Sequence, residues 1–186
     1  MIMKKGQFFM AAAIFLILVF YMGITPYIET FYSGPSVEEE LSDLYENIRT
    51  EFPRAFNLAL KTASPAEALS NFTVFTRNIT TGRGANYRCL WIFTENESGD
   101  LNVTVGNFFD SALNITLNVS GDVSELDVKK SGIASRLFSS PPSEFTLYLS
   151  FNSTESNLLL EKYKANLYLV LEMSKGYDKI AGDLTA

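Results

Sequence analysis

A long uncharged apolar segment near the N-terminus is the feature that most constrains this chain. From Phe8 to Ile28 the sequence has no charged residue, and Thr25 is its only strongly polar one. A helix rises roughly 1.5 Å per residue, so a segment of this length can cross a bilayer core of about 30 Å. The sequence therefore predicts a transmembrane helix over residues 7–28, with membrane lipid around it.

The charges on either side of this segment predict its orientation. Lys4 and Lys5 precede it, whereas the first charges that follow are acidic, beginning with Glu29. Basic residues favour the cytoplasmic side of a membrane. We therefore expect a single-pass protein of the cell membrane, with residues 1–6 in the cytoplasm, a juxtamembrane linker over 29–35, and the rest of the chain extracellular.

The segment differs from an ordinary cleaved signal peptide. Such a signal has an apolar core of about 7 to 15 residues and then an Ala-x-Ala-like cleavage site. Here the apolar core is longer, and Met22, Gly23, Ile24 and Thr25 match that site poorly. A retained membrane anchor is the better interpretation.

The residues before the apolar segment carry a resemblance to a known family. Lys5-Gly6-Gln7, directly ahead of Phe8 to Ile24, is similar to the class III signal peptide of archaeal type IV pilin-like proteins. The resemblance implies that a prepilin peptidase cuts after Gly6, that Gln7 begins the mature chain, and that the apolar helix packs into a filament with itself or with other pilin-like subunits. Many pilins have glutamate at the fifth mature position, where this chain has Ala11.

The resemblance covers only about the first 25 residues. Beyond residue 30 the order of elements resembles that of uncharacterised archaeal membrane-anchored proteins, which implies no activity. A plain uncleaved N-terminal anchor remains the alternative interpretation of the leader.

Composition excludes several classes of function. The chain contains no histidine, which removes the usual general base and the usual metal ligand. Its single cysteine, Cys89, excludes an intramolecular disulfide. A formal net charge of −6 disfavours nucleic acid as a partner, because such binding needs clustered Lys and Arg. We expect no cofactor and no enzymatic activity.

Residues 36–84 are predicted to form amphipathic helices. Ser36 and Glu39 form a capping box, and an apolar stripe at helical spacing then runs from Leu41 to Leu60. Pro53 lies inside the stripe, so the helix either kinks there or restarts at the proline. Packing on the protein's own sheet is favoured over pairing with a partner helix, since the stripe spans only three heptads.

A second helix is predicted after a second capping box at Ser64 and Glu67. Its predicted core face consists of Leu69, Phe72, Phe75 and Ile79. At 100° per residue, Asn71 and Asn78 fall on a shared side that should face water. Gly82-Arg83-Gly84 is interpreted as a helix stop rather than as a phosphate-binding loop.

Residues 85–186 are predicted to form an antiparallel β-domain. Alternation with a period of two begins at Tyr87, and because both of its faces are apolar this segment should be a central strand. Cleaner alternation at 101–105 and 113–120 predicts half-buried strands, and further strands are expected at 145–151, 158–163 and 167–173. Five to eight strands in a sheet or sandwich, with the helices packed on it or below it, give an α+β fold class.

Seven asparagines match the glycosylation pattern Asn-x-Ser/Thr. They are Asn71, Asn78, Asn96, Asn102, Asn114, Asn118 and Asn152. Chance would give roughly two matches, given the frequency of Ser and Thr among the residues two positions after asparagine. Strands rich in Asn and Thr produce the pattern without glycosylation, but this does not account for Asn96 in a turn or for the two helical sites. We predict glycosylation at some of them.

Other clusters have structural explanations that outweigh a functional one. Cys89 is interpreted as a buried apolar residue rather than a palmitoylation or redox site. Glu38 to Glu40 form the first turn of a helix rather than a cation site. Asp122, Glu125 and Asp127 lack the spacing of a calcium loop.

Two hypotheses for function follow. The first is a membrane-anchored extracellular protein of pilin-like type, serving as a filament subunit or surface component. The second is a monomeric anchored binding module, a receptor or adhesin with an uncleaved anchor. An extracellular enzyme has no specific support in the sequence.

Overall fold

The computed structural model describes residues 36–152 and 154–186. The predicted leader, transmembrane helix and linker lie outside the described residues, so the structure does not bear on them. Among the described helices, none combines the length and the apolar character needed to cross a bilayer.

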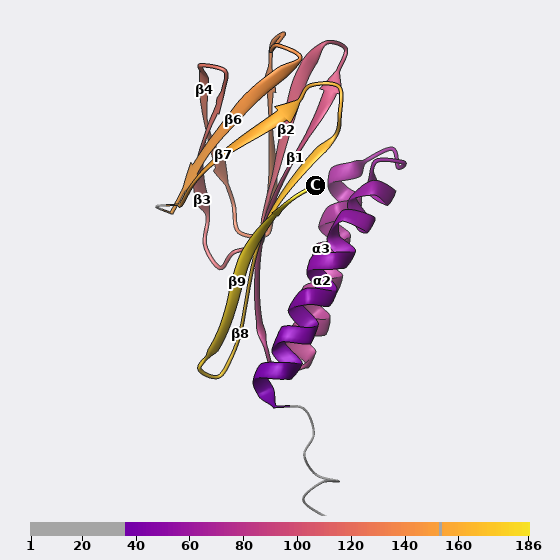
Figure 1. Cartoon of the computed structure of the whole chain (residues 1–186), viewed down its shortest axis with the longest axis vertical. Coiled ribbons are helices and arrows are strands. Elements are labelled where there is room, and N and C mark those ends of the chain that lie inside the picture. Colours follow the sequence, from indigo (N-terminus) through magenta and orange to yellow (C-terminus); the bar gives the residue numbers. More distant parts are fainter. Residues whose placement is uncertain (1–35, 153) are drawn as a thin grey trace, which may run out of the picture. The chain divides into compact units, whose positions relative to one another are not determined.

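The described chain is an α+β structure of two helices followed by two antiparallel sheets (Figure 1). The helices are α2 (Val37–Ala59) and α3 (Pro65–Gly82). The first sheet has the order β5-β2-β1-β8-β9, and the second has the order β4-β3-β6-β7. The strands are β1 (Asn86–Glu97), β2 (Asp100–Asn107), β3 (Leu113–Val119), β4 (Asp122–Val128), β5 (Gly132–Phe138), β6 (Glu144–Phe151), β7 (Thr154–Glu161), β8 (Asn166–Lys175) and β9 (Asp178–Thr185).

Helix α2 confirms its predicted start and its predicted buried face. The backbone N–H of Glu39 donates to Ser36 Oγ at 3.2 Å, and the N–H of Ser36 donates to the Glu39 carboxylate at 2.9 Å. The stripe is buried against the five-stranded sheet, and Phe52 is fully inaccessible. Pro53 lies inside one continuous helix, so a restart at the proline is excluded.

Helix α3 differs from the prediction in two ways. Ser64 precedes the helix but makes no side-chain capping bond, so the second capping box is not formed. The buried face consists of Leu69, Thr73, Thr76 and Thr80. Phe75 and Ile79, predicted to be core residues, are 59% and 38% exposed. Tyr87 and Trp91 of the sheet lie against Thr76 and Thr73, so large side chains of the sheet meet short ones of the helix on this face.

Strand β1 is central in its sheet, as predicted, and both of its faces are buried. Tyr87, Cys89, Trp91 and Phe93 belong to the core between sheet and helices. Leu90 and Ile92 belong to a second core, which lies between the two sheets. The β-domain is therefore a sandwich with the helices covering the outer face of one sheet, and β1 separates its two cores.

Strands β4, β5 and β9 were not predicted, so the described chain has nine strands rather than five to eight. Most residues of β4 and β5 are exposed or half-buried, and β9 has no fully buried residue. These strands lie at sheet edges. Edge strands bury fewer side chains, so their apolar alternation is weak.

A glycine in β2 permits the tryptophan of β1 to lie flat on the sheet. Gly106 is the direct antiparallel partner of Trp91. A Cβ atom at position 106 would overlap the six-membered ring of the Trp91 indole. The indole also stacks against Phe93, with the ring centroids 5.8 Å apart. Gly106 therefore leaves the space that Trp91, the largest side chain in the helix-facing core, occupies.

We predict that Gly106→Ala lowers the free energy of unfolding by about 1–3 kcal/mol, because the added methyl group overpacks the site. The measurement is urea unfolding followed by the fluorescence of Trp91, the only tryptophan. Gly82→Ala is the matched control, since a Cβ there meets no atom within 4 Å. Equal unfolding midpoints for the two variants would contradict this packing.

Candidate functional site

The predicted processing residues Lys5, Gly6 and Gln7 lie outside the described residues. The structure can therefore test where the predicted glycosylation sites lie. It also shows the grooves and charge clusters on the surface of the folded domain.

Every predicted glycosylation site has an asparagine that reaches the surface at least in part. Asn102 and Asn118 are half-buried. The other five asparagines are exposed, and they are Asn71, Asn78, Asn96, Asn114 and Asn152. The predicted exposure of Asn71 and Asn78 on α3 is thus confirmed.

The asparagine side chains differ in what they bind. Asn96, predicted to lie in a turn, instead lies near the end of β1, and Asn118 lies near the end of β3. At both strand ends the side-chain carbonyl is engaged by the turn that follows: Asn96 Oδ1 accepts from the Gly99 N–H at 3.3 Å, and Asn118 Oδ1 accepts from the Gly121 N–H at 2.8 Å. In two strands the amide nitrogen donates instead: Asn102 to Glu95 at 3.2 Å, and Asn114 to Asp127 at 3.0 Å. At Asn96 and Asn118 these contacts use the oxygen, whereas at Asn102 and Asn114 they use the nitrogen that would carry a glycan.

The threonines of α3 form buried polar contacts with β1. Thr73 Oγ1 donates to the Leu69 carbonyl at 2.8 Å and accepts from the Trp91 indole N–H at 3.1 Å. Thr76 Oγ1 lies 3.0 Å from the Tyr87 hydroxyl. Buried donors need partners, so these contacts select one register of α3 on the sheet.

We predict that Thr73→Val lowers the free energy of unfolding by about 1–3 kcal/mol, because the buried Trp91 N–H loses its acceptor while the side-chain shape is kept. Urea unfolding of unglycosylated protein provides the measurement. Thr81→Val is the control on the same helix, because Thr81 is exposed. An unchanged midpoint for Thr73→Val would show that this hydrogen bond does not position α3.

Cys89 is fully buried, as predicted, in the helix-facing core. Burial raises the pKa of its thiol to about 12. Burial also raises the pKa of the neighbouring Tyr87 hydroxyl well above its ordinary value. A neutral, inaccessible thiol is neither a nucleophile nor a lipidation site.

We predict that iodoacetamide leaves Cys89 unmodified in the folded protein at pH 8.5 and modifies it fully in concentrated urea, as measured by mass spectrometry. The unfolded thiol loses its proton near pH 8.5, whereas the folded thiol keeps it up to about pH 12. The free energy of unfolding should therefore fall as the pH rises between these values. Rapid modification of folded protein would contradict the burial.

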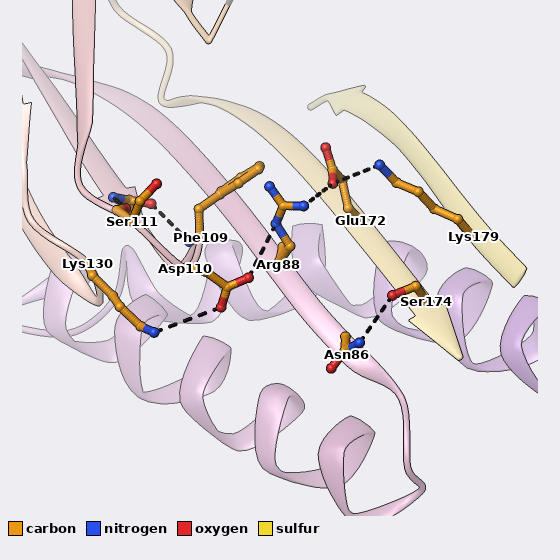
Figure 2. A network of polar contacts seen from close by, with 10 residues as sticks. Asn86, Arg88, Phe109, Asp110, Ser111, Lys130, Glu172, Ser174 and Lys179 are labelled. Atoms are coloured by element: carbon orange, nitrogen blue, oxygen red, sulfur yellow. Dashed lines mark hydrogen bonds and ion pairs between the residues drawn. The ribbon is translucent and has the colours of Figure 1, made fainter. Parts of the chain in front are cut away.

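A row of alternating charges crosses the end of the five-stranded sheet (Figure 2). Asp110 lies 3.9 Å from Lys130 and 3.7 Å from Arg88, and Glu172 lies 3.2 Å from both Arg88 and Lys179. These residues come from β1, β8, β9 and two connections, so local sequence pattern gave no signal for them. The Arg88 guanidinium also lies over the Phe109 ring, 4.8 Å from its centroid.

This row has a structural explanation. Its side chains are 21% to 77% exposed, so each pair contributes only about 0–1 kcal/mol to stability. Asn107, which is fully buried, fixes the adjoining connection by donating to the Ser111 and Val128 carbonyls at 2.8 and 3.0 Å. The charges therefore join two connections to the strands of the five-stranded sheet.

The acidic clusters named in the sequence do not form cation sites in the described chain. In the described residues no group of three or more His, Cys, Asp or Glu could hold a metal ion. Asp122 and Asp127 lie on opposite faces of β4, because side chains alternate along a strand. Glu40 forms an ion pair with Lys175 at 2.8 Å, and this hydrogen bond lowers the pKa of the Glu40 carboxyl.

An apolar groove lies between α2 and α3, and sequence reasoning missed it. It has a volume of about 150 Å³. Leu44 and Ile48 line it from α2, and Phe72, Phe75 and Ile79 line it from α3. No pattern within one helix gave a signal for it, because the groove forms only where the two helices meet.

A second, more polar groove lies beside the edge strand β7. It has a volume of about 380 Å³ and is lined by residues of β7, β8 and β9. Ser156 and Tyr168 share a hydrogen bond of 2.9 Å there, and Asp183 also lines the groove. Burial raises the pKa of the Tyr168 hydroxyl, so this group is a neutral donor or acceptor.

Comparison with known proteins gave no assignment: no protein-family model matches the chain, and no curated protein matches it.

Proposed function

We propose that this chain is a non-enzymatic, membrane-anchored extracellular protein of pilin-like type, acting as a filament subunit or a structural component of the cell surface. The observation that carries the proposal is Lys5-Gly6-Gln7 placed directly before the apolar segment. General signal peptidase cuts after an apolar segment, so a recognition sequence ahead of it favours a prepilin-type peptidase.

The distribution of the predicted glycosylation sites supports an extracellular location. Asparagines of this pattern occur on α3, on three strands and, at Asn152, in a turn, and five of the seven are exposed. A glycan is bulky and solubilising, so it requires surface positions of this kind. Membrane lipid around residues 7–28 is the partner that the sequence predicts directly.

The groove between α2 and α3 supports contact with other subunits. Exposed apolar side chains that gather in one groove are typical of surfaces that bind another molecule. Phe75, at 59% exposure, is the most prominent of them. If the chain forms a filament, its partner at this groove is a neighbouring copy or another pilin-like subunit that is held in the same membrane.

The composition supports a role without catalysis. The absence of histidine removes the most common general base, and burial keeps Cys89 protonated. The remaining titratable side chains are mostly carboxylates and lysines on the surface, where they favour solubility.

A monomeric anchored binding module is the alternative function. The groove beside β7 favours it, because Ser156, Tyr168 and Asp183 combine hydrogen-bonding groups with an apolar wall. In this case the N-terminal anchor would remain uncleaved and no filament would form.

We predict that protein purified from its native cells begins at Gln7 and carries added hexose mass, as measured by intact-mass analysis. Gly6→Val should block cleavage, because the peptidase implied by the leader cuts after this glycine. Gly23→Val is the matched control, since it changes a glycine inside the apolar segment and should leave cleavage intact.

A native chain that still begins at Met1 or Met3 would contradict the pilin-type role. If micrographs of such cells also lacked a filament containing this chain, the binding module would be the better account.

A further inference from the structure

We propose that Asn71 and Asn78 receive their glycans before α3 folds onto the sheet, whereas Asn96 accepts a glycan on the folded protein. The inference rests on the extracellular, glycosylated role proposed above. It divides the predicted sites by a property that the sequence pattern does not contain, the accessibility of the hydroxyl two positions after the asparagine.

The hydroxyl residue is part of what the transferase recognises, since the pattern requires Ser or Thr at that position. For the two sites on α3 these residues are Thr73 and Thr80, and both are 0% exposed. Thr73 Oγ1 is bonded to the Leu69 carbonyl and to the Trp91 indole, and Thr80 Oγ1 donates to the Thr76 carbonyl at 2.8 Å. In the folded domain neither hydroxyl can contact an enzyme.

Local fraying of α3 would not open the site at Asn71 easily. Thr73 accepts from the Trp91 indole, whose ring lies in the same core as Leu69 and Phe52. Exposing its hydroxyl requires α3 to leave the sheet, which opens this core to water. Segments held by many buried apolar contacts open far more rarely than loops or termini.

The site at Asn96 has the opposite geometry. Asn96 and Ser98 are both exposed; Asn96 lies near the end of β1, and Ser98 lies in the turn that follows it. Ser98 has a φ of 56° and is followed by Gly99, so these two residues form a tight turn between β1 and β2. The side-chain carbonyl of Asn96 accepts from the Gly99 N–H, and the side chain as a whole is exposed, so the contact leaves the amide nitrogen for a glycan. A transferase can therefore still bind this site after the protein has folded.

Early modification is compatible with folding of the helix. Asn71 and Asn78 lie on the exposed side of α3, whereas Thr73 and Thr80 lie on its buried face. Residues two positions apart on a helix point about 200° apart. A glycan on either asparagine therefore projects into water while the threonines pack on the sheet. Asn102 belongs to the same early class, because Thr104 is 2% exposed and bonded to Ser135.

The transfer uses a polyprenyl-phosphate-linked oligosaccharide as donor. The asparagine Nδ2 forms a bond to the anomeric carbon, and the bond between that carbon and the phosphate oxygen breaks. One amide proton leaves the nitrogen, and the lipid phosphate departs with the bonding electron pair. No oxidant or reductant is needed.

The test compares full-length chain with open acceptors. Chain made without glycosylation is held folded in detergent and incubated with native-cell membranes, which supply the transferase and its lipid-linked donor. Synthetic peptides of residues 68–83 and 93–101 serve as unfolded acceptors in parallel. Glycopeptide mass spectrometry gives the rate at each site, and Asn78→Gln and Asn96→Gln variants verify the assignments.

We expect Asn96 of the folded chain to be modified at least about tenfold faster than Asn71 or Asn78, since those sites wait for a rare opening of α3. The two peptides should react at similar rates. Similar rates at all three sites of the folded chain would overturn the order proposed here and leave the extracellular role intact. A lack of modification in both chain and peptides would overturn the glycosylated role itself, and this ordering with it.

Discussion

The burial of β1 on both faces is the constraint on which the rest of the structure depends. One face of the strand packs against the helices through Tyr87, Cys89, Trp91 and Phe93, and the other packs against the second sheet through Leu90 and Ile92. A strand that is apolar on both faces must pack against another element on each side. The helices and the four-stranded sheet are these elements.

The same strand explains the composition of α3. Trp91 and Phe93 fill the space between sheet and helix, and Gly106 lets the indole lie close to β2. The helix then needs short side chains that can accept the indole N–H, and Thr73 has both properties. The buried threonines Thr73 and Thr80 also complete two glycosylation patterns. In the order proposed above, the transferase recognises them before folding, and they pack against the sheet afterwards.

Much of the fold could be predicted from the sequence, because most elements have a local pattern. The Ser36–Glu39 capping box, the stripe of α2 and the two apolar faces of β1 are properties of neighbouring residues. The predicted core face of α3 was right at Leu69 and Phe72 and wrong at Phe75 and Ile79. Hydrophobicity ranks Phe75 above Thr76 and contains no information about the space opposite them. The edge strands β4, β5 and β9 were missed for lack of apolar alternation. The grooves and the charge row join distant segments, so no local pattern could reveal them.

The central claim for function is that the folded domain lies outside the cell, and surface labelling of intact native cells tests it most directly. Lys61 and Lys129 are exposed on the folded domain. A membrane-impermeant amine reagent should label both on intact cells, while a cytoplasmic control protein stays unlabelled. Labelling of Lys61 and Lys129 only after lysis would place the domain inside the cell and contradict the account.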